Sequence, residues 1–176
     1  WGALTYSNTT DMVLYDSSTM TVQGGGTLLL FSPFVSSENT RVRVNNVTTL
    51  CASAGFMVNG YFFIGEGSLF TTCEESYPLI IGATGSTELF GSLEVAAGGN
   101  AEIYSSISLN SPEAVVLLQS GSSTVMDGTV YITYGNGVDG GTATGGVHVL
   151  CGALIMQSGG DYAIDRLIVT CGGVTV

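Results

Sequence analysis

The chain has 176 residues, of which 45% are hydrophobic and only 10% are charged, with 14 acidic residues against three arginines and no lysine. Its formal net charge of −11 argues against nucleic-acid binding, because such proteins need basic patches that displace counterions from phosphates. No run reaches the roughly 18 apolar residues of a membrane-spanning helix, and a chain this acidic is repelled by anionic lipid. We therefore expect one domain over residues 1–176 that engages neither nucleic acid nor membrane.

Short alternations of apolar and polar residues, separated by Gly, Ser and Asn, run through the whole chain and predict β-strands. In the N-terminal half the predicted strands are 3–6, 12–15, 19–22, 27–31, 41–44, 47–51, 68–73 and 78–81, with an aromatic stretch over 56–64. In the C-terminal half they are 92–96, 101–109, 115–119, 147–151, 154–157, 162–170 and 174–176. Residues 135–146 form one long glycine-rich loop, interpreted as a mobile loop or a contact surface. Apolar residues rarely recur at the three- or four-residue spacing of a helix for more than one turn, so we expect an all-β protein.

Residues 60–109 resemble residues 121–170 when the sequence is shifted by 61 positions. The shift carries Gly91-Ser-Leu93 onto Gly152-Ala-Leu154, and most matches are turn glycines and alternating apolar residues. Sixty-one is close to three coils of about 20 residues, which favours a β-solenoid whose strands stack about 4.8 Å apart. Uneven glycine spacing leaves a β-sandwich or jelly roll of antiparallel hairpins as the alternative.

Four cysteines predict two disulfides in an oxidising compartment. Cys51 and Cys73 are 22 residues apart, and Cys151 and Cys171 are 20 apart. A coil of about 20 residues would place each pair on adjacent strands at a distance that a disulfide can span. We therefore expect Cys51–Cys73 and Cys151–Cys171, with disulfides between subunits as the alternative. Zinc is not expected, because there is no Cys-x-x-Cys motif and the lone histidine, His148, lies in a strand.

Candidate catalytic groups are few. His148 has no activated serine or cysteine context, so it is interpreted as a solvent-facing strand residue. Asp161, Asp165 and Arg166 lie near the second Gly-Gly turn. They are interpreted as a surface turn with an Asp–Arg pair rather than as the two carboxylates of a glycosidase. We therefore expect no catalytic residue and no cofactor.

Two further groups allow a structural and a binding interpretation. Glu66 and Asp127 match across the shift of 61, each just before a glycine, and are read as turn acids, with calcium binding as the alternative. An aromatic segment surrounds Asn59-Gly60, which signals a hairpin or a solenoid corner. Its rings are expected in the core, with a sugar-binding platform as the alternative. They belong to Phe56, Tyr61, Phe62 and Phe63.

Several features suggest an extracellular protein. The chain begins at Trp1 instead of methionine, which is compatible with a removed signal peptide. Two Asn-x-Thr sequons make Asn8 and Asn46 possible glycosylation sites if the protein is secreted. The strands near the two ends alternate like those elsewhere and have no polar or charged cap, so we expect them to pair with copies of the chain. These assembly residues are Ala3, Leu4, Thr5, Tyr6, Val174, Thr175 and Val176.

The start at Trp1, the absence of lysine, strands such as Gly173-Val-Thr-Val176 and the four dispersed cysteines together carry a resemblance to known proteins. The chain resembles extracellular self-assembling β-proteins of prokaryotic cell surfaces, such as the tubular sheath proteins of methanogenic archaea and strand-donating surface filaments. This resemblance implies a homopolymer with a mechanical role and no enzymatic activity. The expected function is thus a secreted structural subunit that polymerises by β-strand pairing into a filament, tube or sheath, stabilised by disulfides. A glycan-binding adhesin or fibre module is the alternative.

Overall fold

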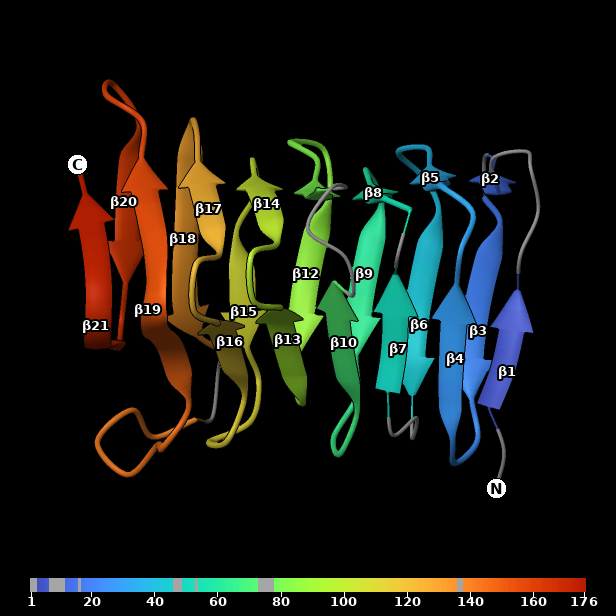
Figure 1. The fold of residues 1–176 in the computed structure, drawn as a ribbon, viewed down its shortest axis with the longest axis horizontal. Helices are drawn as coiled ribbons and strands as arrows, with labels where there is room; N and C mark the ends of the chain where they lie inside the picture. The colour runs from blue at the N-terminus through green and yellow to red at the C-terminus, as the bar shows by residue number, and fades with distance from the viewer. Residues whose placement is uncertain are drawn as a thin grey trace.

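The computed structural model covers residues 1–176, and it describes residues 12–15, 17–45, 49–52, 54–72, 78–135 and 138–176, together with the backbone of residues 3–6. The described residues form 21 β-strands and no helix. Accordingly, this part of the chain offers no helix that is long and apolar enough to span a membrane. All strand pairs are parallel, and the chain winds as a β-solenoid of about seven turns (Figure 1). The all-β solenoid prediction is confirmed, whereas an antiparallel sandwich is not what the chain forms.

Each complete coil passes through three sides of the solenoid. Side one contains β1 (Ala3–Tyr6), β4 (Thr27–Leu30), β7 (Thr49–Ala52), β10 (Leu69–Thr72), β13 (Ser92–Val95) and β16 (Val115–Leu118). Side two contains β2 (Met12–Leu14), β5 (Phe34–Ser36), β8 (Phe56–Val58), β11 (Leu79–Ile81), β14 (Asn100–Ile103) and β17 (Ser123–Met126). Side three contains β3 (Thr19–Gln23), β6 (Arg41–Asn45), β9 (Tyr61–Ile64), β12 (Ser86–Leu89), β15 (Ile107–Leu109), β18 (Thr129–Tyr134) and β20 (Asp161–Ile164).

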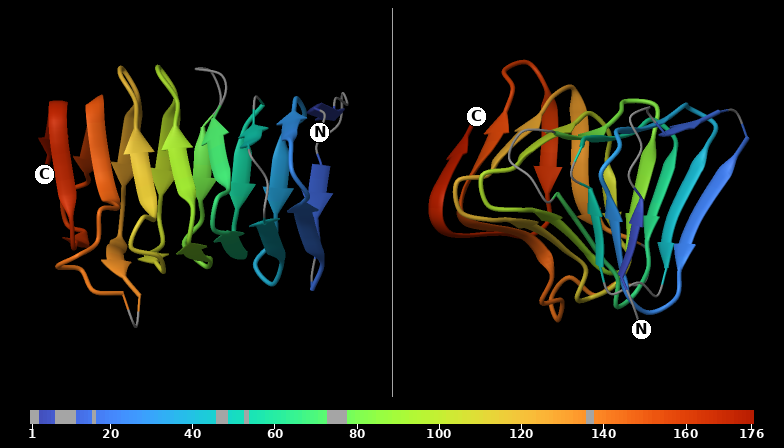
Figure 2. Two further views of the ribbon diagram at one scale, coloured as in Figure 1. Left: turned by 90° about the horizontal axis from the view of Figure 1, so that it is seen from below. Right: turned by 45° about the vertical axis from the view of Figure 1, so that its right-hand side comes forward.

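The last two coils join the first two sides. β19 (Gly146–Met156) and β21 (Leu167–Thr175) each run along side one and side two without a break, so these sides form one 14-stranded sheet. Side three remains a separate seven-stranded sheet. Figure 2 shows the coils stacked in chain order, with β1 and β21 at opposite ends of the stack. The prediction of separate strands at 147–151 and 154–157 is therefore corrected to one continuous strand.

Interior side chains form straight rows along the solenoid axis, because parallel pairing places equivalent positions of successive coils side by side. One row of side one consists of Leu28, Leu50, Phe70, Leu93, Val116, Val147 and Leu167. Neighbours in this row are 20 to 23 residues apart, except that 31 residues separate Val116 and Val147. The longer coil accommodates the loop between β18 and β19. Coil length is thus close to the predicted value.

The sequence shift of 61 positions does not relate equivalent positions of the coil. Leu93 lies on side one, in register with Val116, whereas Leu154 lies on side two, in register with Thr124. The shift therefore moves a strand to a different side of the solenoid. What 60–109 and 121–170 share is the alternation and the turn glycines that every coil needs.

Phenylalanines from all three sides meet inside the solenoid. Phe56 of side two lies 4.8 Å from Phe70 of side one and 5.8 Å from Phe62 of side three, between ring centroids. Phe34 of the preceding coil stacks on Phe56 at 4.4 Å. All four rings are at most 2% exposed. Burying each such side chain contributes about 1.5–3 kcal/mol, so this cluster stabilises the middle of the stack.

A disulfide joins the last two coils. Cys151 in β19 is bonded to Cys171 in β21, as the spacing of 20 residues predicts for adjacent strands of one chain. Cys151 has a φ of 61° and lies where the β19–β21 register is irregular, so the strand bulges at this position. Cys51 is also disulfide-bonded. Its predicted partner Cys73 lies outside the described residues, as do the sequons at Asn8 and Asn46.

Candidate functional site

The outer face of the seven-stranded sheet concentrates aromatic and polar side chains. Side chains alternate in a strand, so Val42 and Phe62 point into the core and are fully buried, while their neighbours point outward. Arg41 and Arg43 project from β6, and Tyr61 projects from β9 beside Arg41. This face thus carries residues that the core does not use.

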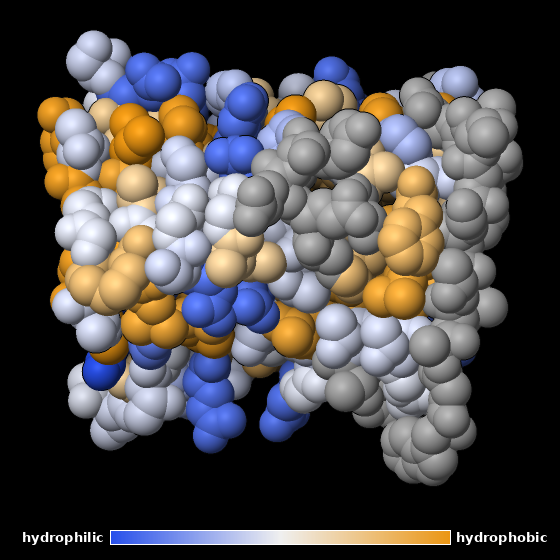
Figure 3. Space-filling view, viewed as in Figure 1, coloured by the Kyte–Doolittle hydropathy of each residue, from blue (hydrophilic) through white to orange (hydrophobic). Residues whose placement is uncertain are grey.

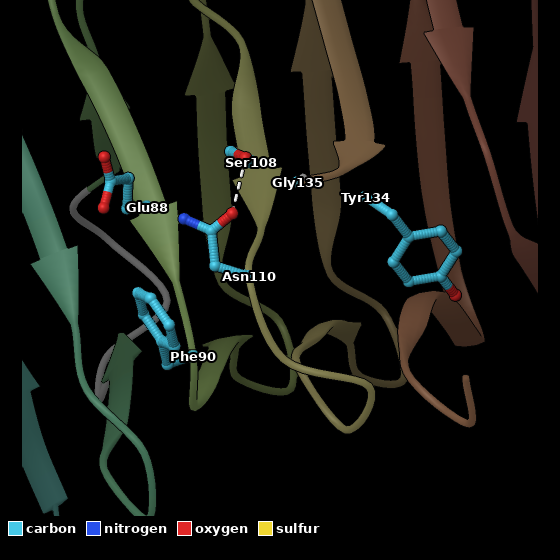
Figure 4. Close-up of a pocket in the computed structure, with 6 residues that line it drawn as sticks. All are labelled: Glu88, Phe90, Ser108, Asn110, Tyr134 and Gly135. Atoms are coloured by element: carbon cyan, nitrogen blue, oxygen red, sulfur yellow. Dashed lines mark hydrogen bonds between the residues drawn. The ribbon is translucent and has the colours of Figure 1, made fainter. Parts of the chain in front are cut away.

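A shallow groove of about 600 Å³ crosses this face over β12, β15 and the end of β18. Its lining residues are Glu88, Phe90, Ser108, Asn110, Tyr134 and Gly135 (Figure 4). Glu88 and Phe90 lie on one side of Asn110, and Tyr134 lies on the other. The Ser108 hydroxyl donates to Asn110 Oδ1 at 2.9 Å, which fixes the amide in the middle of the groove. The groove therefore combines a carboxylate, an amide, a hydroxyl and aromatic rings.

Aromatic rings continue from the groove toward β6. The ring of Phe63 lies 5.4 Å from that of Phe90 and 6.4 Å from that of Tyr61, between centroids. The guanidinium carbon of Arg43 lies 5.1 Å from the centre of the Phe63 ring, within the range of a cation–π contact. We call Tyr61, Phe63 and Phe90 the aromatic stripe. Tyr61 and Phe63 lie on β9 and Phe90 follows β12 on the next coil, so the stripe runs mainly along the strand direction and spans two coils.

Two glycines make room for these side chains. A methyl group at Gly135 would overlap Asn110 Oδ1 and would lie 3.0 Å from the Ser108 hydroxyl oxygen. A methyl group at Gly65 would lie 2.6 Å from Asn45 Oδ1 and 3.2 Å from the Phe63 ring. Both glycines are therefore needed for space in the row that contains Phe90 and Asn110.

The phenol of Tyr61 is held in its protonated form. Burial raises the pKa of Tyr61, and its hydrogen bond to Glu88 raises the pKa further. The phenol oxygen donates to Glu88 Oε2 at 3.1 Å. Tyr61 therefore orients one oxygen of Glu88 and leaves the other free to accept from a ligand.

His148 lies on the outer face of side one, as expected, but it is half-buried. Its neighbours in the row are Leu117 and Ile168. Its Nε2 atom is buried and has no hydrogen-bond partner among the described residues. Neither of these two neighbours is a carboxylate or a nucleophile.

The acidic residues near the C-terminus accept local hydrogen bonds. Asp161 accepts from the Tyr131 hydroxyl at 2.5 Å, and Asp165 accepts from the Tyr134 backbone N–H at 2.7 Å. Arg166 donates to the carbonyl of Ala143 and forms no ion pair within the described part of the chain. The interpretation of Asp165 and Arg166 as an ion pair is wrong, since the guanidinium instead anchors the loop before β19.

Glu66 and Asp127 occupy exposed turns, each before a glycine with a positive φ. In the described ranges no three His, Cys, Asp or Glu side chains come together as a possible metal site. The two acids are thus placed in turns, as the sequence indicates.

The aromatic segment divides between core and surface. Phe56 and Phe62 are buried, whereas Tyr61 and Phe63 belong to the aromatic stripe. The turn at Asn59-Gly60 is a corner between sides two and three. Sequence reasoning missed Phe90, Ser108 and Asn110, because Phe90 lies one coil before the other two. Only the register of β12 with β15 brings them together.

The assembly residues lie at the ends of the stack. Ala3, Leu4, Thr5 and Tyr6 form β1, which pairs with β4. Val174 and Thr175 belong to β21, and Val176 follows it and is 87% exposed. Hydrophobic residues are visible over the β19–β21 end of the molecule in Figure 3.

We predict that Glu88→Gln lowers the pKa of the Tyr61 phenol, because the carboxylate that accepts its proton and repels the phenolate is removed. The pKa stays above its usual value, since burial is the larger cause. In the native protein the raised pKa stabilises the fold below the ordinary tyrosine pKa, and this contribution is lost as the pH rises through the raised value. An NMR titration of ring-labelled tyrosine measures the change.

Tyr131 is the control for this titration, because its pKa is raised mainly by the hydrogen bond to Asp161. Its titration should be the same in both proteins. An unchanged Tyr61 pKa in the variant would show that Tyr61 and Glu88 do not interact in solution.

Comparisons of the chain with protein-family models, curated proteins and solved structures give no match.

Proposed function

We propose that this protein is an extracellular glycan-binding module that holds a polysaccharide along the outer face of its seven-stranded sheet. The observation that carries the proposal is the groove beside the aromatic stripe. Sugar rings present apolar C–H faces and polar hydroxyl edges. Aromatic rings can cover the faces, while a few fixed polar groups orient the edges.

The polar groups of the groove can form hydrogen bonds with sugar hydroxyl groups. Asn110 is fixed by Ser108, so its amide nitrogen can donate to a sugar oxygen. Glu88 accepts one bond from Tyr61 and has a second oxygen for a sugar hydroxyl. Because Glu88 and Asn110 lie on neighbouring coils about 4.8 Å apart, successive sugar units of one polymer can contact them.

Binding fits the groove better than hydrolysis does. Glycosidases use a pair of carboxyl groups that flank the scissile bond. Among the six residues that line the groove, Glu88 alone has a carboxylate. The Cys151–Cys171 disulfide supports a location outside the cytoplasm, since disulfides persist in oxidising compartments.

We predict that Phe63→Ala and Phe90→Ala each weaken polysaccharide binding about fivefold, because each removes an aromatic contact of about 1 kcal/mol. Glycan-array screening identifies the bound polysaccharide, and isothermal titration calorimetry measures the loss. Phe31→Ala is the matched control: Phe31 is 43% exposed and precedes β5, away from the seven-stranded sheet. If Phe63→Ala and Phe90→Ala bind the polysaccharide as tightly as Phe31→Ala does, the proposed site is wrong.

A second function, end-to-end association of copies, is supported by the end coils. Leu167 and Val169 continue the interior rows of Val147 and Val149, but they are 37% and 45% exposed while the two valines are fully buried. At the other end Met12, Met20 and Leu28 line an apolar cavity of about 320 Å³. Either further coils or a second copy would cover these rows, and the structural-subunit function requires the second copy.

We predict filaments or stacked particles in electron micrographs of the purified protein, and their loss in Val169→Glu, because a charge in an interior row opposes stacking. Ala97→Glu is the control, since Ala97 is an exposed turn residue between β13 and β14, away from both ends of the stack. Monodisperse single particles of the unsubstituted protein would rule out this second function.

A further inference from the structure

The two arginines of β6 form no ion pair with the described residues of this acidic protein. The chain has only three Lys and Arg residues, and Arg41 and Arg43 both project from the outer face of the seven-stranded sheet. Both are exposed, and neither forms an ion pair with any residue that the structure describes, although the chain has 14 acidic residues. Their positive charges are therefore available to a ligand.

Arg43 is aligned with the groove. It is in register with Phe63, and Phe63 is in register with Glu88, so Arg43 lies two strands from the groove, or about 10 Å along the axis. Its guanidinium packs on the Phe63 ring. This leaves the N–H groups at the guanidinium edge free to bind a carboxylate in a bidentate manner.

Arg41 adds a second charge at the same end. It lies two positions from Arg43 on one strand, so their Cα atoms are about 6.6 Å apart across the axis. It is in register with Tyr61 of the aromatic stripe. The two guanidinium groups can thus approach one charged sugar from two directions.

We propose that the ligand is an acidic polysaccharide in which uronic-acid units are separated by neutral units. This inference rests on the proposed glycan-binding function and adds its chemical class. A carboxylate binds at Arg41 and Arg43, and a neutral unit occupies the groove with its sugar face on Phe90. A neutral unit is required there because Glu88 repels a second carboxylate and accepts hydroxyl groups instead.

The test uses hyaluronan and gellan fragments, in which uronic acid is separated by neutral sugars, each beside its carboxyl-reduced form. Polygalacturonate serves as an all-acidic polymer. Calorimetry should show tighter binding of an alternating polymer than of its reduced form, and weaker binding of polygalacturonate. Arg43→Gln and Arg41→Gln should each weaken binding of the acidic form about threefold to tenfold and leave the reduced form unchanged.

Arg166→Gln is the matched control, because it removes the remaining arginine, which binds the Ala143 carbonyl and lies outside the row of Arg43, Phe63 and Glu88. Equal binding of acidic and reduced forms, or no effect of the β6 substitutions, overturns the acidic class and leaves the proposed function intact. Tighter binding of polygalacturonate than of both alternating polymers also overturns it. Failure of every acidic and neutral polymer to bind, here and on the array, overturns the proposed function as well.

Discussion

Parallel register between successive coils is the constraint on which the rest of the structure depends. Each coil must place an apolar side chain beside the equivalent residue of the previous coil, because these rows are the whole core. The row from Leu28 to Leu167 and the phenylalanines around Phe56 satisfy this requirement. A β-strand turns every second side chain inward, so the core determines only half of the positions in each strand.

The outward-facing positions of each strand are not determined by the core, and the candidate site lies at such positions. On the outer face of the seven-stranded sheet, register again decides what comes together: Arg43, Phe63, Glu88 and Ser108 occupy one straight row. Such a row extends along the axis in the direction in which a polymer would lie. A fold that stacks strands at a fixed spacing therefore suits a repeating ligand, and the site needs no loop to shape it.

The sequence predicted the all-β solenoid and the Cys151–Cys171 pair, because alternation, turn glycines and a coil of about 20 residues are local properties. The sequence did not predict the turns between sides of the solenoid that contain no glycine. The expected strand 162–170 is divided at Asp165-Arg166 into β20 and β21, since backbone pairing with Ile132 and Val147 decides the turn. The groove was missed for a similar reason: Phe90 and Asn110 have no motif in the sequence, and only the exact length of each coil brings them together.

The central claim is that a glycan binds the outer face of the seven-stranded sheet with its charged end at β6. It is tested most directly by following backbone amide resonances during titration with an alternating acidic oligosaccharide. The account predicts shifts confined to β6, β9, β12, β15 and the end of β18, with little change in the 14-stranded sheet. Shifts that cluster on sides one and two, or at the two ends of the stack, would contradict it.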